Sequence, residues 1–472
     1  MKLNELTIKE AKGGLKSKKF SSVELTKACL EQIKKHNKDL NAFITVTEKE
    51  ALDSARKADD LASQDQVLEA KSLLGIPIAL KDLFSTKGIK TTAASNVLKD
   101  YIPQYDAAVV KKIKDAGAII IGKTNCDAWA HGSSGENSDF GPTKNPWDKE
   151  YVPGGSSSGS AVSVASDMCI ASTGTDTGGS IRLPASFNNV VGLKPTYGRV
   201  SRYGIIAMAS SLDSIGHFTK TVEDSALFFN VTAGQDKMDA TTLPNPVEDF
   251  TKDLNKGIKG LKIGIPKEFV TSDLDNEAKE KFEETVKTFA NLGAEIIEIS
   301  LPYTEYGIAA YYIIQPSEVS SNLARYDGIR YGNDRSYFGD EAKRRIMLGT
   351  FTLSSGYYDA YYKKAMAVRT LIIKDFNDAF QKVDALISPV CPTLPWKLGE
   401  KINDPIKMYM SDVLTVTANL AGIPGLSLPI GFIDGLPVGM QILGPQLSEV
   451  KLFQIGYAYE QATQWRKQKP AL

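Results

Sequence analysis

The chain has 472 residues, of which 42% are hydrophobic and 24% are charged, and its 56 basic residues balance 56 acidic ones. A chain of this length can bury a large core, in one large domain or in two. The charge balance excludes the broad basic excess that marks autonomous nucleic-acid binding, and no apolar run is long enough to span a bilayer.

The cysteines and the N-terminus bear on the cellular compartment. Cys29, Cys126, Cys169 and Cys391 are far apart and show no metal-ligand spacing, as suits a reducing environment. Residues 1–5 lack the apolar core of a signal peptide. We therefore expect a cytoplasmic protein without membrane contact.

The first part of the chain, up to about residue 63, reads as helical. Residues 21–24 (Ser-Ser-Val-Glu) form a capping-box sequence before an amphipathic run that reaches His36. The apolar run 74–80 predicts a buried strand that ends at Lys81. Residues 106–117 then predict a helix, which leads into a strand at 118–121.

The middle of the chain carries the most informative pattern. Two Gly/Ser-rich segments, 153–159 and 174–182, flank a run at 160–172 that is rich in Ala, Val and Ser and predicts a buried helix. Glycine lets a backbone approach a ligand closely, and serine can act as a nucleophile or a proton relay. The pattern predicts two loops held in fixed relation, as a catalytic site requires.

Three other interpretations of the Gly/Ser segments are open. A flexible linker would be flanked by polar filler, whereas apolar, patterned sequence flanks these segments. A phosphate loop needs G-x-x-x-x-G-K-[ST], which is missing. Residues 155–159 match a G-x-S-x-G nucleophile elbow centred on Ser157, with His217 the only histidine in the required chain order, but 148–153 make a poor preceding strand.

Because histidine is scarce, Lys81 is the strongest candidate for the base that activates a serine. A lysine that emerges from apolar surroundings is costly to keep charged, so its pKa should fall toward a usable range. The alternative is a lysine at a strand end that extends its amine to solvent.

The rest of the chain alternates between strands and helices, which predicts an α/β fold with a largely buried sheet. The polar, proline-containing stretch 235–260 reads as an excursion between two halves of one domain. Strands are expected at 261–265, 294–299, 385–390, 426–430 and 438–443, and helices at 276–292, 357–383 and 450–463.

Three motifs together resemble the amidase signature family: 75–82, 154–157 and 174–182. The resemblance implies a Ser-cisSer-Lys triad, with Lys81 as the base, Ser156 as the bridging serine after a cis peptide bond, and Ser180 as the nucleophile. It also implies an oxyanion hole. The backbone amides expected to form it belong to Thr177, Gly178 and Gly179.

The same resemblance implies the fold and its extent. We expect the amidase signature fold, an α/β architecture in which helices cover both faces of a mixed central sheet. The whole chain, 1–472, is then a single domain. Its parts are an N-terminal helical part (1–65), the signature core (66–234) and the second half of the same core (235–472).

Further motifs resemble the branch of this family that works in tRNA-dependent amidotransferases, which act on glutamyl-tRNA(Gln) or aspartyl-tRNA(Asn). They lie at 122–125, 145–146, 191–196, 198–204, 210–213, 343–350, 354–362 and 419–425. This resemblance implies a glutamine-hydrolysing subunit of a carbon–nitrogen ligase that serves protein biosynthesis. The ammonia would pass to partner subunits B and C of a heterotrimer. The partner would use ATP and Mg²⁺ and hold most of the misacylated tRNA, and this chain would need no cofactor and no metal.

The resemblance also assigns the ends of the glutamine substrate. Arg345 resembles the residue that binds the α-carboxylate, although its neighbour Arg344 is an alternative. Asp412 resembles the partner of the α-ammonium, and Tyr311 is a further contact candidate. A stand-alone amidase acting on an aryl or aliphatic amide and a non-catalytic scaffold are the alternative functions. The charged pair argues against the first, and the intact triad argues against the second.

The chain departs from the family pattern at a few positions. Ser158 stands where many members carry glycine, and His217 stands where proline is usual. Cys126, Ala128 and Trp129, with His131, replace the residues common after Lys-Thr-Asn. His131 is expected either to influence substrate fit or to be a partly buried structural histidine.

Overall fold

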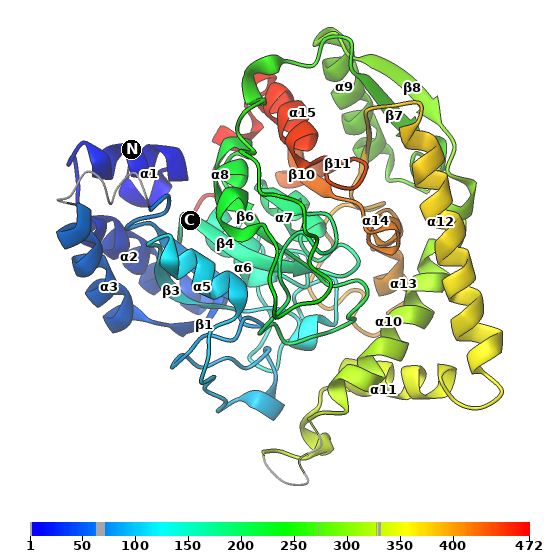
Figure 1. The fold of residues 1–472 in the computed structure, drawn as a ribbon, viewed down its shortest axis with the longest axis horizontal. Helices are drawn as coiled ribbons and strands as arrows, with labels where there is room; N and C mark the ends of the chain where they lie inside the picture. The colour runs from blue at the N-terminus through cyan, green and yellow to red at the C-terminus, as the bar shows by residue number, and fades with distance from the viewer. Residues whose placement is uncertain (1, 63–70, 272, 327, 329–331) are drawn as a thin grey trace.

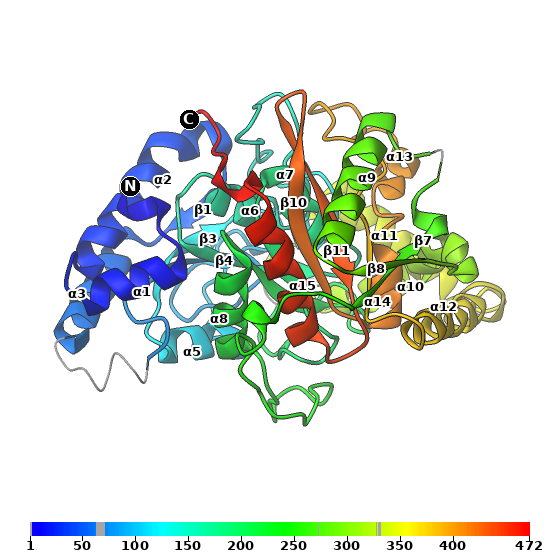
Figure 2. The same cartoon turned by 90° about the horizontal axis from the view of Figure 1, so that it is seen from above.

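The computed structural model describes residues 2–62, 71–271, 273–326, 328 and 332–472. Its strands form one mixed sheet of eleven strands, in the order β1-β3-β2-β4-β6-β5-β10-β11-β9-β7-β8 (Figures 1 and 2). The strands are β1 (Phe43–Val46), β2 (Pro77–Lys81), β3 (Ile119–Thr124), β4 (Ala171–Asp176), β5 (Val191–Lys194), β6 (Ser214–Thr219), β7 (Lys262–Pro266), β8 (Glu295–Ile299), β9 (Ala385–Pro389), β10 (Gly425–Ile433) and β11 (Leu436–Leu443).

Helices cover both faces of this sheet, and the alternation of side chains along β10 shows how. Leu426 and Leu428 pack against Gly456 of α15, whereas Ser427 between them donates to the carbonyl of Arg182, at the start of α7, on the opposite face. The described helices are α1 (Ile8–Lys16), α2 (Ser22–Leu40), α3 (Glu48–Ala62), α5 (Ala108–Asp115), α6 (Ser158–Ala165), α7 (Arg182–Asn188), α8 (Val222–Thr232), α9 (Asn276–Asn291), α10 (Gly307–Leu323), α11 (Asp340–Thr352), α12 (Lys364–Phe380), α13 (Pro405–Met410), α14 (Val416–Ala421) and α15 (Glu449–Ala462). In these described ranges, no helix is both long and apolar enough to cross a membrane.

The pairing of β2 and β4 sets the position of the site. These strands run parallel, with Ile78 opposite Ala171 and Ala79 opposite Ser172. Because the carboxyl ends of parallel strands meet at one edge of a sheet, Lys81 at the end of β2 and the Gly-rich turn after β4 lie at the same edge.

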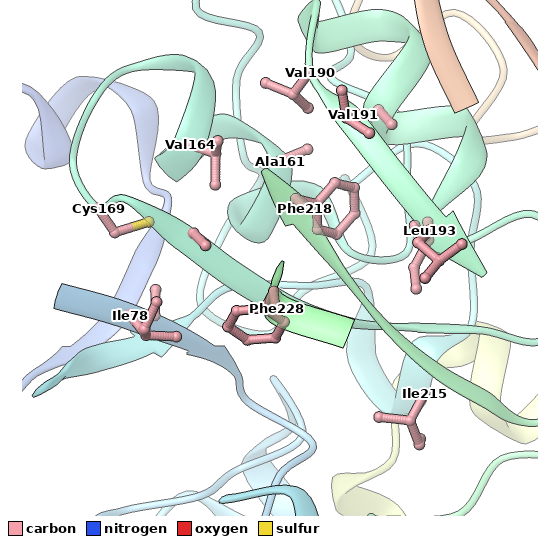
Figure 3. Packing of buried hydrophobic residues seen from close by; sticks show 14 of the residues in the cluster. Ile78, Ala161, Val164, Cys169, Val190, Val191, Leu193, Ile215, Phe218 and Phe228 are labelled. Atoms are coloured by element: carbon pink, nitrogen blue, oxygen red, sulfur yellow. The ribbon is translucent and has the colours of Figure 1, made fainter. Parts of the chain in front are cut away.

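The core beneath this edge is closely packed. Phe218 of β6, Phe228 of α8 and Ile78 of β2 are fully buried on neighbouring elements (Figure 3). Helix α6 approaches the backbone nearby, since a Cβ on Gly159 would lie 2.3 Å from the carbonyl oxygen of Ala42. That contact accounts for the glycine, and it fixes the start of the helix that follows the Gly/Ser loop.

The predicted fold class is confirmed, and so are most of the predicted elements. The five later strands all form, and α2 begins at a capping box in which Ser21 and Glu24 bond reciprocally. Helix 276–292 is α9, helix 450–463 is α15, and helix 357–383 is a π-helical turn (Tyr358–Lys363) followed by α12.

Two predictions about the N-terminal half are wrong. The helical part is interrupted by β1, whose Phe-Ile-Thr-Val sequence suits a strand and pairs with β3. The helix predicted at 160–172 ends at Ala165, and β4 begins at Ala171, so the second Gly/Ser segment starts inside a strand. The end of the predicted N-terminal part, 63–65, lies outside the described residues.

Candidate active site

Lys81 ends β2 with its side chain completely buried among hydroxyl groups. Its Nζ lies 2.8 Å from Ser156 Oγ, 2.9 Å from Ser157 Oγ and 2.8 Å from Thr175 Oγ1. Its backbone amide donates to Thr173 Oγ1 at 3.0 Å, because Thr173 and Thr175 share one face of β4. The amine therefore faces three hydroxyl groups, and hydrogen bonds from β4 fix both the backbone and the side chain of Lys81.

The surroundings of Lys81 favour its neutral form. Burial lowers the pKa of its ammonium to about 8, against the opposing influence of Cys126 and of Asp127 and other carboxylates nearby. Ser157 Oγ donates to the Thr175 carbonyl at 3.1 Å, so its oxygen is left to accept from the lysine. A neutral amine that donates to Ser157 and Thr175 keeps its lone pair for the hydroxyl of Ser156.

The two predicted catalytic serines come together at this edge of the sheet. The peptide bond between Gly155 and Ser156 is cis, as the family resemblance implies. The amide of Ser157 donates to the carbonyl of Ser180 at 3.2 Å, which ties the two loops to each other. Ser156 is fully buried, whereas Ser180 is 8% exposed, so Ser180 is the serine that a substrate can reach.

A buried ion pair holds the turn that carries Ser180. The carboxylate of Asp176 accepts from the amides of Gly179 (2.8 Å) and Ile181 (3.1 Å) and from the guanidinium of Arg182 (3.1 Å). Arg182 also donates to Asn419 and Gln441 on the far side of the turn. Burial alone would raise the pKa of Asp176, but the Arg182 charge and hydrogen bonds outweigh it and hold the pKa at about 2.

The amides predicted for the oxyanion hole differ in their partners. The amide of Gly179 is taken by Asp176. Across the described residues, no hydrogen bond uses the amide of Thr177 or Gly178. These two donors are thus available at the turn, whereas that of Gly179 already has an acceptor.

The loop of residues 127–135, in which the sequence singled out His131 but neither Asp127 nor Ser133, supports the first serine loop. The amide of Asp127 donates to the Ser156 carbonyl at 3.1 Å, and the Ser133 carbonyl accepts from the amide of Gly155 at 2.8 Å. The Asp127 carboxylate is buried and accepts from the amide of Gly135 at 3.0 Å. Burial raises the pKa of this carboxyl to about 7.

The same loop reaches Asp412, the predicted partner of the α-ammonium. Ser133 Oγ donates to both Asp412 oxygens, at 2.8 and 2.9 Å, and Tyr312 donates from its hydroxyl at 2.9 Å. Burial raises the pKa of Asp412 to about 6, although these hydrogen bonds oppose the shift. One short loop therefore contacts both the serine loop and a predicted substrate-binding carboxylate.

Arg345 is buried in α11, whereas the side chain of Arg344 is 45% exposed. The Arg345 guanidinium donates to Glu341 at 2.8 Å and to Gln315 at 2.9 Å. It also lies 5.4 Å from the ring centroid of Tyr312 and 5.5 Å from that of Tyr409. This placement favours Arg345 over Arg344 as the ligand of a bound anion.

One face of α10 joins the predicted substrate-binding residues. Gln315 stands four residues after Tyr311 and three after Tyr312, so it lies next to both tyrosines on the helix surface. Tyr311 lies against the Ser180 turn, because a Cβ on Gly178 would be 2.7 Å from its ring. Tyr312 contacts Asp412, and Gln315 contacts Arg345. This part of α10 therefore extends from the predicted nucleophile to the predicted carboxylate site.

A cavity of about 420 Å³ opens beside Arg345. Its lining includes His131, Glu341, Arg345 and Tyr409. His131 itself is fully buried. In the part of the chain that the structure describes, no group of three or more His, Cys, Asp or Glu residues could hold a metal ion.

The nucleophile-elbow interpretation is wrong. His217 belongs to β6, where its Nε2 lies 2.7 Å from Ser225 Oγ and its ring packs against Phe228. Ser157 Oγ contacts Lys81 and Thr175. The serine at the centre of that motif therefore has a lysine beside it, and the histidine is a core residue.

Comparison with known proteins gives a consistent result. The family model described as Amidase matches residues 24–453. The chain is similar to the A subunit of glutamyl-tRNA(Gln) amidotransferase from Geobacter metallireducens, with 51% identity over 489 aligned positions that cover 100% of both chains.

Solved structures show the same relationship. The crystal structure of the A subunit of glutamyl-tRNA(Gln) amidotransferase from Thermotoga maritima aligns with a TM-score of 0.83 and 43% identity, covering 97% of this chain and 95% of that one. A bacterial aryl acylamidase of the amidase signature family aligns with a TM-score of 0.87 and 26% identity, covering 98% and 97%.

Proposed function

Because the chain belongs to the amidase family, we propose that it hydrolyses the side-chain amide of glutamine as the A subunit of a tRNA-dependent amidotransferase. The observation that carries this proposal is the buried Lys81 amine, 2.8 Å from Ser156 Oγ and beside the turn of Ser180. Similarity over full length to proteins of that name supports the choice of substrate.

Catalysis begins with a proton relay. Neutral Lys81 takes the proton of Ser156, Ser156 takes the proton of Ser180, and Ser180 Oγ attacks the amide carbon of glutamine. The tetrahedral oxyanion is stabilised by backbone amides at the turn, for which Thr177 and Gly178 offer donors that have no partner among the described residues.

The intermediate then collapses along the same relay. Ser156 returns the proton to the leaving nitrogen, ammonia departs, and a γ-glutamyl ester remains on Ser180. Water, activated through Ser156 and Lys81, attacks that ester and releases glutamate.

The substrate is held at its charged end. Arg345 binds the α-carboxylate, Asp412 binds the α-ammonium, and Tyr311 covers the turn between them and the reacting amide. Arg345 is buried beside the cavity, and Asp412 is buried against the loop that supports the first serine loop. One positive and one negative buried side chain suit a zwitterionic amino acid. An uncharged amide would offer no charged group to Asp412 or to the side of the Arg345 guanidinium that Glu341 does not reach, which argues against a stand-alone amidase.

The ammonia passes to a partner. We propose that subunits B and C complete a cytoplasmic heterotrimer, in which the partner uses ATP and Mg²⁺ to activate the misacylated tRNA. The chain's balanced charge agrees with tRNA being held mainly by the partner.

A Ser180→Ala variant in the assembled complex tests this function. With misacylated tRNA and ATP, it should give no amidated tRNA from glutamine but normal amidation from free ammonia, since only ammonia production is removed. A Ser163→Ala variant is the matched control, because this buried serine donates to the Ser160 carbonyl within α6 and accepts from the thiol of Cys169, and neither partner belongs to the proposed triad.

Trapping of the acyl-enzyme completes the test. Labelled glutamine should leave its label on Ser180 and not on Ser157. A Ser180→Ala complex that still uses glutamine would overturn the assignment of the nucleophile. A wild-type complex that cannot use glutamine at all would overturn the function.

A further inference from the structure

Two fully buried side chains near Arg345 hold polar atoms without partners. Within the described residues, neither ring nitrogen of His131 has a hydrogen-bond partner, and neither does Nε2 of Gln315. Both side chains are 0% exposed. A buried polar atom left unpaired costs about 1–3 kcal/mol, so a partner such as water or a ligand is expected to complete it.

These atoms gather around one guanidinium. Gln315 accepts from Arg345 Nη1 through its Oε1 at 2.9 Å, which places its free Nε2 beside the arginine. His131 lines the same cavity as Arg345. Burial and the positive charge of Arg345 hold the pKa of His131 well below its usual value, so the imidazole is neutral and carries one N–H donor.

The donors that remain match an anion with two oxygens. Arg345 Nε is taken by Glu341 and Nη1 by Gln315, and no hydrogen bond in the described part of the chain uses its Nη2. Glu341 balances the guanidinium charge only from the Nε side. A carboxylate accepts up to four hydrogen bonds, so it can pair with Nη2, Gln315 Nε2 and the His131 N–H together.

We propose that His131 and Gln315 complete, with Arg345, the site for the α-carboxylate of the substrate. The assignment rests on the proposed function, because that function supplies an amino-acid amide as the ligand. His131 and Gln315 then determine specificity for amides that carry a carboxylate, and they take no part in the bond-breaking steps at Ser180.

Binding of three amides to the full-length Ser180→Ala chain tests the proposal. Glutamine carries both charged groups, glutaric acid monoamide lacks the α-ammonium, and 4-aminobutanamide lacks the α-carboxylate. His131→Ala and Gln315→Ala should each weaken the first two by about 10- to 100-fold, the effect of one hydrogen bond to a charged group. Binding of 4-aminobutanamide should stay unchanged, and His131→Gln, which keeps an N–H donor, should recover part of the affinity.

His36→Ala is the matched control, since His36 lies in α2 with its Nε2 also unpartnered and is only 8% exposed. It should leave all three affinities unchanged.

Nuclear magnetic resonance gives a second readout. The chain has three histidines, so substituting each one in turn assigns the imidazole ¹⁵N signals. Glutamine should shift only the His131 signals.

The outcomes separate this proposal from the proposed function. His131→Ala with unchanged glutamine affinity, equal weakening of all three amides, or His131 signals that do not move would each overturn the carboxylate site. If glutaric acid monoamide binds through these residues but the wild-type complex does not hydrolyse glutamine, the carboxylate site stands and the proposed function fails.

Discussion

Lys81 can act as a base only when its amine has lost its proton, and burial brings its pKa to about 8. The rate of glutamine hydrolysis should therefore rise with pH. At saturating glutamine, log kcat should increase with a slope near one and level off above about pH 8. A pH–rate profile on the assembled complex measures this.

The Lys81→Ala variant is the direct check on that profile. It should lose about two to four orders of magnitude in kcat, the usual contribution of a general base, and the residual rate should no longer rise near pH 8. Circular dichroism would establish that the variant is folded. Near-wild-type activity would show that another group is the base.

Asp412 should affect substrate binding and not the chemical step. Its pKa is raised to about 6 by burial, so above that pH it is charged and can pair with the α-ammonium, and below it the pairing is lost. KM for glutamine should therefore rise as the pH falls through about 6. Asp412→Asn should raise KM at pH 8 and remove this dependence, with little change in kcat.

Glutaric acid monoamide provides the control for Asp412, because it has no α-ammonium to bind. Its KM should be indifferent to Asp412→Asn. Equal losses on glutamine and on the monoamide would mean that Asp412 supports the loop 127–135 through Ser133 and does not bind the substrate.

The helices α10 and α11 are in close contact at Gly349, where an added Cβ would lie 1.9 Å from the carbonyl oxygen of Pro316. Arg345 and Gln315 form their contact one turn away. Gly349→Ala should therefore push α11 outward and misplace Arg345. We expect a rise of about 10-fold or more in KM for glutamine, and a loss of about 1–3 kcal/mol in stability from overpacking.

Steady-state kinetics and thermal unfolding measure the two effects. Gly13→Ala in α1 is the matched control, since its added Cβ would meet nothing within 4 Å. That change should leave KM unaltered and stabilise the chain by about 1 kcal/mol through helix propensity. If Gly349→Ala behaves like Gly13→Ala, the helix contact does not position Arg345.

The sequence predicted those elements whose burial leaves an apolar pattern. Strand β9 is an example, since it begins with three apolar residues, and β7 is another, since Ile263 and Ile265 alternate along it. β4 was missed because it reads Ala-Ser-Thr-Gly-Thr-Asp, although every residue of it is buried. Its two threonines form hydrogen bonds with Lys81. Because these site-facing positions are polar, the strand lacks the apolar pattern by which buried strands are predicted.

The residues of the candidate site also fall into two groups, those that a local sequence motif predicts and those that only the fold brings together. Lys81, Ser156 and Ser180 stand in local motifs that a sequence comparison can find. Thr175 and Gln315 act through contacts with residues 94 and 30 positions away, and no local pattern announces such pairs. The strand order brings Thr175 to Lys81, and the packing of α10 on α11 brings Gln315 to Arg345.

The single domain predicted for 1–472 remains a prediction, and the way the parts are joined makes it testable. Helix α1 docks on α8, where the amide of Ile8 donates to Asp224 at 2.8 Å, and Lys469 near the C-terminus pairs with Asp167. Unfolding followed by far-ultraviolet circular dichroism and by tryptophan fluorescence should then give one coincident transition. Two separate transitions would indicate two independently folding units.

The clamp around Arg182 has a consequence for how the protein is made. Its partners Asn419 and Gln441 lie 237 and 259 residues further along the chain. The ribosome therefore synthesises every predicted catalytic side chain long before these two residues, which help to hold the Ser180 turn through Arg182. A nascent or truncated chain that stops short of β11 has the predicted triad but lacks Gln441, one of the partners that hold Arg182. We therefore expect full glutamine hydrolysis to appear only when translation is nearly finished.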